Sequence, residues 1–302
     1  MATESRDRIY EAIRAGKPLD FTPVIDMHGH FGPSALVCGP SLVDPEKALR
    51  EMDAYGAAAV CFSTISIGCA GSLARANDEV LRVVRALPGR ALGYAVLSST
   101  RPERNLDELR RCYDLGLRCG VKMHRYDQPP YRLTDAFLGP VFEFLGERRL
   151  IYLNHDLGPV DDLITVARRY PGVSFINGHG SAVHARLGMA YANIYANSCA
   201  MNWHRSVEDV VAECGSGHLT LGSDFSLMQL GFGLGQIAYA EITEADKRAI
   251  LGGNAMRIFE GMEWFRDDPP AGLRRHAETE KRREPQRTQR AQGTKTNGKK
   301  MR

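Results

Sequence analysis

Eight short apolar runs recur along the chain and start about 20 to 35 residues apart, with helical patterns between most of them. Strands buried on both faces read as continuous apolar runs, and this spacing is typical of repeated strand–helix units. We therefore predict an α/β protein, a (β/α)8 TIM barrel, with a doubly wound open sheet as the alternative. The runs cover residues 24–30, 57–66, 91–97, 119–124, 150–156, 173–179, 193–199 and 219–225.

Helix boundaries agree with this division of the chain. Asp44 followed by Pro45 is typical of a helix start, and Gly56 predicts the end of that helix. Asn105 is expected to cap a second helix, which Gly116 terminates. Both segments lie between predicted strands, as the barrel requires.

Charge and composition divide the chain into three parts. Residues 1–21 form a helical lead-in, residues 22–265 form the barrel, and residues 266–302 form a basic tail. The tail carries 12 lysines and arginines against 5 acidic residues, whereas the whole chain has a net charge of only +3. Because the tail has almost no apolar residues, we expect it to be disordered and able to contact an acidic partner or nucleic acid.

The seven cysteines and the lack of long apolar segments indicate a compartment. The cysteine count is odd and no pair is spaced C-x-x-C, which indicates reduced thiols rather than disulfides. No apolar run approaches the roughly 18 residues that a membrane span needs, and the N-terminus lacks an apolar stretch of signal-peptide type. We expect a cytoplasmic protein without a membrane span; its oligomeric state stays open, a homo-oligomer included.

His28 and His30 come at the end of the first apolar run, with Asp26 one step below them. Because side chains alternate across a strand, the two imidazoles project into the same space. Two neutral imidazoles at this separation can share one metal ion such as zinc. An isolated His-x-His pair also arises by chance, so this motif alone does not establish a site.

Three further runs also end in metal-binding residue types. His155 ends the fifth run, His179 the sixth and Asp224 the eighth. In a barrel, catalytic groups gather at the carboxyl ends of the strands. A buried core histidine is the usual explanation for each residue taken singly. Agreement among four separate strand ends favours a common site instead.

These residues resemble the amidohydrolase superfamily. The sequence Asp26-Met27-His28-Gly29-His30, the later His155, His179 and Asp224, and the segments VSFINGHG and AILGGNAMRIF are similar to its amidohydrolase-2 branch. That branch includes aminocarboxymuconate-semialdehyde decarboxylase, and the resemblance covers about residues 22–262. It implies a (β/α)8 fold with one divalent metal, usually zinc and sometimes manganese. It further implies the ligands His28, His30, His155 and Asp224, with His179 beside the metal-bound water or the substrate oxygen.

Asp224 and His179 are accordingly the predicted catalytic residues. A metal held by imidazoles and a carboxylate lowers the pKa of bound water toward about 7. Asp224 could then take a proton from the water, and His179 could donate to the oxygen on which negative charge develops. This is the chemistry of hydrolysis.

Lys122 and His124 lie two residues apart on the fourth run and face the same space, beside Arg125. We expect all three to contact the substrate, although Lys122 could instead hold an internal carboxylate, and His124 and Arg125 could be polar loop residues without a role. In other amidohydrolases a lysine on strand 4 is carbamylated and bridges two metals, and His155 and His179 would then bind the second ion. The amidohydrolase-2 branch favours one metal, so two metals bridged by Lys122 remain the alternative.

Two weaker features remain after the strand ends. Residues 231–236, GFGLGQ, lack the dinucleotide-binding spacing and are expected to form a flexible loop. Residues following the seventh run could line the rim of the pocket, although a buried cysteine or an aromatic lid residue needs no function. These are Asn197, Cys199, Trp203 and His204.

The sequence therefore predicts a metal-dependent hydrolase that cleaves a C–N or C–O bond in a small molecule such as a cyclic amide or a lactone. The alternative is non-oxidative decarboxylation of an unsaturated or aromatic carboxylic acid. A third hypothesis is a nucleic-acid or membrane-surface binder that acts through the tail. The metal-type residues at four strand ends argue against the third as the main function.

Overall fold

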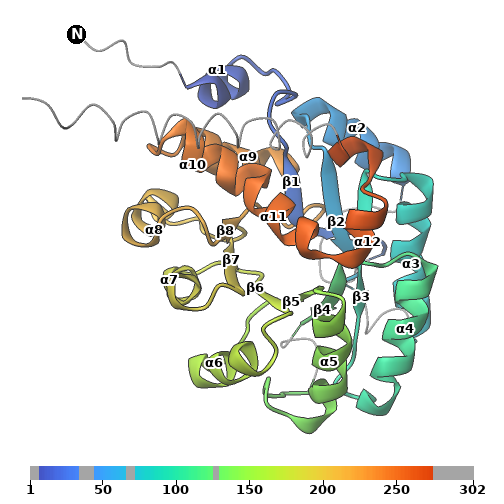
Figure 1. The fold of residues 1–302 in the computed structure, drawn as a ribbon. Coiled ribbons are helices and arrows are strands. Elements are labelled where there is room, and N and C mark those ends of the chain that lie inside the picture. The colour runs from blue at the N-terminus through green and yellow to red at the C-terminus, as the bar shows by residue number, and fades with distance from the viewer. Residues whose placement is uncertain (1–6, 34–43, 66–71, 125–128, 275–302) are drawn as a thin grey trace, which may run out of the picture.

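The structure, a computed structural model, describes residues 7–33, 44–65, 72–124 and 129–274. Eight parallel strands form a single sheet in sequence order, and helices surround it (Figure 1). The predicted (β/α)8 barrel is confirmed. The strands are β1 (Ile25–His30), β2 (Ala59–Ser63), β3 (Ala91–Val96), β4 (Gly120–Met123), β5 (Ile151–Asn154), β6 (Ser174–Asn177), β7 (Ile194–Asn197) and β8 (Leu219–Thr220).

The segment that follows β8 meets β1 and closes the barrel. The amide of Met27 donates to the carbonyl of Leu221 at 2.9 Å, and the amide of Asp224 donates to the carbonyl of His28 at 2.9 Å. A parallel bridge between Gly29 and Phe225 continues this contact. A doubly wound sheet is open, and its strands do not follow one another in sequence order. Here the strands do follow sequence order and the sheet closes on itself, so the alternative fold is wrong.

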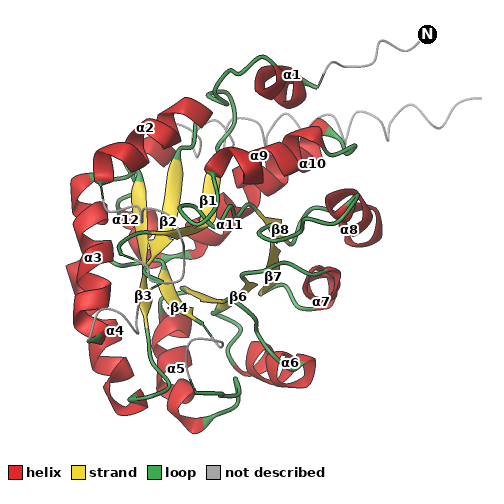
Figure 2. Cartoon of the chain, turned by 180° about the vertical axis from the view of Figure 1, so that it is seen from behind, coloured by secondary structure: helices red, strands yellow, loops and turns green. Residues whose placement is uncertain are grey.

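The helices lie outside the ring of strands, as the view from behind shows (Figure 2). They are α1 (Arg8–Arg14), α2 (Pro45–Tyr55), α3 (Leu73–Ala86), α4 (Asn105–Leu115), α5 (Gly139–Glu147), α6 (Val160–Arg169), α7 (Ala182–Ala190), α8 (Ser206–Cys214), α9 (Leu230–Tyr239), α10 (Glu244–Arg248), α11 (Asn254–Gly261) and α12 (Glu263–Asp267). Short 3-10 turns, η1 (Pro102–Arg104) and η3 (Ala136–Leu138), precede α4 and α5, and a π-helical turn, η4 (Ala249–Gly253), joins α10 to α11.

The predicted boundaries of α2 are confirmed, whereas the predicted cap of α4 is wrong. Asp44 accepts a hydrogen bond from the amide of Glu46, and Gly56 ends α2 with φ of 74°. Asn105 does not cap α4, because the turn η1 already leads into the helix. The Asn105 side chain instead accepts from the Ser98 amide at 3.0 Å and donates to the Ser98 carbonyl at 2.9 Å. It thereby fixes the loop after β3.

The barrel interior is filled by side chains rather than open. Tyr94 and Tyr152 are fully buried, and the Tyr94 hydroxyl donates to the Met27 carbonyl at 3.1 Å. Every residue of β1, β2 and β3 is buried, as parallel strands covered by helices require. The interior is therefore a packed floor, and polar residues that reach beyond it gather at the carboxyl ends of the strands.

Residues 231–236 form part of helix α9, so the predicted flexible loop is wrong. The glycines that suggested a loop allow close packing instead. A Cβ on Gly231 would lie 2.5 Å from the Tyr55 ring, and one on Gly233 would lie 2.9 Å from the Ser223 Cβ. The helix thus packs tightly beside the segment that carries Asp224.

The expected start of the disordered tail at residue 266 is too early. Helix α12 extends to Asp267, and Leu273 is completely buried. Gly272 lies close to the backbone between strands, with a built Cβ 3.3 Å from the carbonyl oxygens of Ala58 and Gly89. Gly272 and the buried Leu273 therefore lie against the rest of the barrel, next to the residues that precede β2 and β3. Residues 275–302, and with them the expected partner of the tail, lie outside the described residues.

Candidate active site

Strand β1 places His28 and His30 at the carboxyl end of the barrel. Asp26, below them, forms hydrogen bonds within the protein instead. Its carboxylate accepts from the amides of His28 at 2.9 Å and Ser223 at 3.1 Å, and also from the Ser223 hydroxyl. Complete burial raises the pKa of Asp26 to about 7 even though these hydrogen bonds oppose the rise. Asp26 therefore ties the Asp224 segment to β1.

The two nitrogens of His28 have different partners. Nδ1 lies 3.0 Å from the carbonyl oxygen of Gly178, and a carbonyl only accepts, so Nδ1 carries the proton. Nε2 then holds a lone pair, to which the Lys122 amine donates at 2.7 Å. Burial, followed by the charge of Lys122, holds the pKa of His28 well below its ordinary value. His28 is thus a neutral imidazole whose lone pair faces the site.

His30 contacts Asp224 directly. Its Nε2 lies 2.9 Å from Oδ1 of Asp224, while Nδ1 lies 3.2 Å from the hydroxyl of Ser63 on β2. Burial lowers the pKa of His30, although the hydrogen bond to Asp224 works in the opposite direction. The Ser63 hydroxyl can either donate or accept, so it can support either tautomer of the imidazole.

Three imidazoles lie within 4 Å of the Asp224 carboxylate. Besides His30, Nε2 of His28 lies 3.5 Å from Oδ1 and Nε2 of His179 lies 3.7 Å from Oδ2. Burial acts to raise the pKa of Asp224, but the hydrogen bond from His30 and the electrostatic influence of His28, His30 and Lys122 outweigh it and hold the pKa below its ordinary value. The residue has φ of 60°, a left-handed conformation that non-glycine residues rarely adopt.

Three histidines that follow β4, β5 and β6 contact one another ring to ring, and the third, His179, also lies near this carboxylate. The ring centroids of His155 and His179 are 3.6 Å apart, and those of His124 and His155 are 4.2 Å apart. Burial is the main cause that lowers the pKa of His124 to about 3 and of His155 to about 3. Burial also lowers the pKa of His179. The rings are therefore neutral at physiological pH and able to bind a metal or donate hydrogen bonds.

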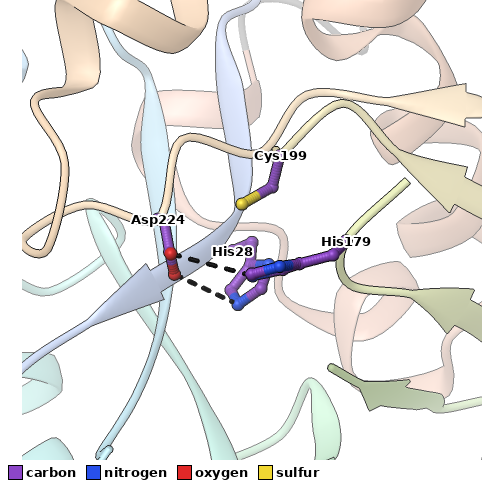
Figure 3. Close-up of side chains that lie close together, drawn as sticks. All are labelled: His28, His179, Cys199 and Asp224. Carbon is purple, nitrogen blue, oxygen red and sulfur yellow. Dashed lines mark ion pairs between the residues drawn. The ribbon is translucent and has the colours of Figure 1, made fainter. Parts of the chain in front are cut away.

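Four donor atoms lie within 4.8 Å of one another and form a group that could hold a metal ion (Figure 3). They belong to His28, His179, Cys199 and Asp224. Within the described part of the chain, the Nε2 atom of His179 is buried and makes no hydrogen bond. Imidazole, thiolate and carboxylate are the donor types that zinc prefers, so the residues present fit a divalent transition metal.

The structure brings most of the predicted site residues together. His28, His30, His179, Asp224 and Lys122 meet in one cluster. The predicted ligand His155 stacks on His179, and the predicted substrate contact His124 lies beyond it. Arg125 lies outside the described residues. The predicted ligand set and roles stay predictions.

Cys199 is the donor that sequence reasoning left without a role. It follows β7 by two residues, so it occupies a strand end like the histidines, and this position was the available signal. It is 2% exposed, and burial raises the pKa of its thiol. Of the other residues after β7, Asn197 is buried, whereas Trp203 is 51% exposed and His204 is exposed, so these two lie on the rim or outside it.

The sequence profile of the Amidohydro_2 family, described as amidohydrolase, matches residues 25–261. The chain belongs to the amidohydrolase-2 family. This match spans the whole barrel, confirms the resemblance seen at the strand ends, and makes the protein an enzyme of that family. No curated protein sequence matches the chain significantly.

Solved structures show the same fold. The 2,6-dihydroxybenzoate decarboxylase from Rhizobium has a TM-score of 0.65 at 18% identity, covering 79% of this amidohydrolase and 99% of that chain. The 5-carboxyvanillate decarboxylase from Sphingomonas paucimobilis has a TM-score of 0.59 at 17% identity, with coverages of 79% and 99%. A dihydroxybenzoic acid decarboxylase from Polaromonas sp. JS666, solved with manganese and 2-nitroresorcinol, has a TM-score of 0.62 at 18% identity, with coverages of 79% and 97%. At these identities the likeness establishes the fold alone.

The structure also bears on the expectations about membrane spans and disulfides. Within the described residues, no helix of this amidohydrolase has the length and apolar character needed to cross a membrane. All five cysteines in the same residues are free thiols: Cys61, Cys112, Cys119, Cys199 and Cys214.

Proposed function

We propose that this amidohydrolase-2 protein is a metal-dependent, non-oxidative decarboxylase of an unsaturated or aromatic carboxylic acid. The observation that carries the proposal is the buried Lys122 amine, 2.7 Å from Nε2 of His28, in a cluster that contains the Asp224 carboxylate. A divalent ion together with a protonated Lys122 would outweigh that carboxylate. Such a site favours an anionic substrate, and a lactone or cyclic amide is neutral.

We propose one metal ion per chain, zinc before manganese, held by His28, His30, His155 and Asp224. The ion would supply Lewis-acid stabilisation of negative charge on substrate oxygens. The hydrogen bond from Nδ1 of His28 to Gly178 supports this ligand role, because an outer partner orients the imidazole and leaves Nε2 for the ion. The 2.7 Å contact of Lys122 leaves little space for a carbamate there, which supports one ion.

Metal binding by His28 would break its hydrogen bond with Lys122. The lone pair that now accepts from Lys122 is the one an ion would take, so the amine is released from His28. Lys122 would then donate to the substrate carboxylate. His124, stacked next to His155, and Arg125 are the further candidates for contacts with the acid.

Asp224 is the candidate proton donor. The lowered pKa leaves Asp224 ionised at neutral pH, so it would first take up a proton from water. The protonated carboxyl group would then be a strong acid, as protonation of carbon requires. The O–H bond of Asp224 would break as a C–H bond forms at the carbon that bears the carboxylate. The C–C bond to that carboxylate then breaks, its electron pair returns to the unsaturated system, and carbon dioxide leaves. His179, 3.7 Å from Oδ2, would hold the Asp224 carboxylate in place.

The named relatives support this choice over hydrolysis. The three similar structures described above are decarboxylases of hydroxylated aromatic acids, and one holds manganese. Hydrolysis stays the second candidate, because the ionised Asp224 and the unbonded Nε2 of His179 would also suit a base and a donor acting on a carbonyl.

A paired substrate panel decides between the two reactions. Hydroxybenzoate-type acids, lactones and cyclic amides would be offered to the metal-loaded enzyme, with release of carbon dioxide and of acid measured separately. We expect carbon dioxide release that is lost in Asp224→Asn, a variant that keeps the shape of the side chain. Asp156→Asn, at the loop after β5, is the matched control. Acid release from lactones or amides without carbon dioxide would overturn the proposal.

A further inference from the structure

Cys199 aims its thiol into the group of donor atoms around Asp224 (Figure 3). Its Sγ atom lies within 4.8 Å of the donor atoms of His28, His179 and Asp224, and the residue is only 2% exposed. These four donors come from the ends of β1, β6 and β7 and from the segment after β8. Each of these four segments therefore contributes one potential metal ligand to the same group.

The backbone holds Cys199 in register with His179. The amide of Gly180, the residue after His179, donates to the Cys199 carbonyl at 3.0 Å. A Cβ on Gly180 would lie 1.9 Å from the Asn197 carbonyl oxygen, so the close approach needs glycine. The Cys199 amide donates to the Asn197 side chain at 3.1 Å, and that buried side chain donates to the Leu221 carbonyl at 3.0 Å. Hydrogen bonds from the ends of β6 and β7 therefore position the backbone of Cys199.

The residue after Cys199 stores backbone strain. Ala200 has φ of 60°, as Asp224 does. The left-handed conformation costs a non-glycine residue about 1–2 kcal/mol. Such conformations concentrate at functional sites. Both strained residues thus lie at the site, one in the group of donors and one directly beside it.

A packing role explains the other buried cysteines better than it explains Cys199. The Cys112 thiol lies on the outer helix α4 and donates to Glu108, and the Cys61 thiol lies 3.9 Å from the sulfur of Met27 inside the barrel. Neither belongs to a group of metal-binding donors within the described residues. Cys199 shares their burial and differs in its neighbours.

We propose that Cys199 is a further ligand of the metal ion, in addition to the four proposed above, so that the segment after β7 contributes a thiolate to the site and selects zinc over manganese. This inference rests on the metal dependence proposed above. The sulfur–metal bond forms as the thiol releases its proton to solvent, and no electron is transferred. Thiolate is a soft ligand that suits zinc, whereas manganese prefers oxygen donors.

X-ray absorption at the zinc edge tests the proposal on the unaltered full-length protein loaded with Zn²⁺. We expect a sulfur neighbour at about 2.3 Å from the ion, in addition to nitrogen and oxygen at about 2.0–2.2 Å. A first shell without sulfur, at one bound ion per chain, would overturn the proposal whether or not any variant folds.

Cobalt binding gives a second readout. The apo-protein titrated with Co²⁺ should develop thiolate-to-metal absorption in the near ultraviolet. The absorption should be absent in Cys199→Ser and retained in Cys112→Ser, which removes a buried thiol elsewhere. Cys199→Ser should also lower the affinity for Zn²⁺ by at least about tenfold more than that for Mn²⁺. Equal absorption in both variants contradicts the proposal.

The outcomes separate this inference from the proposed function. Carbon dioxide release with a sulfur-free metal shell would remove Cys199 as a ligand and leave the decarboxylase standing. A sulfur-bound ion in an enzyme that releases acid from lactones would support the ligand and remove the decarboxylase.

Discussion

The Lys122 amine lies 2.7 Å from Nε2 of His28 and donates to the lone pair that a metal ion would bind. The competition follows from the Gly178 carbonyl, which accepts from Nδ1 and thereby leaves the lone pair on Nε2. One amine on β4 would therefore link the proposed metal binding at β1 to the charge that a substrate meets.

Removal of this amine should strengthen metal binding. Lys122→Met eliminates the competing hydrogen bond, so the apo-protein should bind Zn²⁺ about tenfold more tightly, the equivalent of roughly 1.4 kcal/mol. Turnover should fall, because the substrate carboxylate loses its partner. Isothermal titration measures the Zn²⁺ affinity, elemental analysis the number of ions per chain, and carbon dioxide release the turnover. Lys247→Met, which removes a buried lysine bonded to the Ala238 carbonyl far from the site, should leave metal affinity unchanged. Two ions per chain in the parent, reduced to one or none by Lys122→Met, would instead identify a bridging carbamate.

Loss of a β1 imidazole should empty the site without unfolding the barrel. His28→Ala should bind less than about a tenth of the parent's metal under limiting Zn²⁺, since a lost ligand costs more than the 10- to 100-fold of a lost outer partner. The circular dichroism spectrum should persist because the core is large. His184→Ala alters a buried histidine bonded to Ser181 instead, and should keep full occupancy. Full metal content and activity in His28→Ala would remove β1 from the site.

Stability of the apo-protein should decrease as the pH falls. His155 has a pKa of about 3 in the folded protein, mainly through burial, against 6.5 when unfolded. Below pH 6.5 the unfolded chain binds the extra proton, so the free energy of unfolding declines from there toward pH 3. Asp26, whose pKa is raised to about 7, acts in the opposite sense, and comparison with a variant removes its contribution. Urea unfolding from pH 7 to 4 should show a smaller decline in His155→Gln than in the parent. His204→Gln, at an exposed position, should match the parent.

Leu273 should contribute to the stability of the barrel although it lies in a mostly polar segment. It is fully buried, so Leu273→Ala should lower the free energy of unfolding by about 2–5 kcal/mol. Leu115→Ala, at a position 41% exposed, should cost less than about 1 kcal/mol. Equal urea midpoints for Leu273→Ala and the parent would show that Leu273 does not stabilise the barrel, and would support the tail boundary at residue 266.

Local patterns determined the barrel and most of the site. Continuous apolar runs specify strands buried on both faces, and their spacing specifies the helices between them, so the order of β1 to β8 could be read in advance. His28, His30, His179 and Asp224 followed from the same patterns, because a barrel brings all strand ends to one face. Asp44 and Gly56 bounded α2 through interactions within a few residues.

Contacts between distant segments decided the rest. The glycines of α9 predicted a loop, but in the structure they allow Tyr55 and Ser223 to pack closely against the helix. Asn105 forms hydrogen bonds with Ser98 rather than with the start of its own helix. Cys199 looks like any buried cysteine in the sequence, and its place beside His179, His28 and Asp224 is visible only in the folded barrel. Periodicity and capping act over a few residues and are visible in a sequence, whereas distances between donor atoms on different strands arise only when the barrel closes.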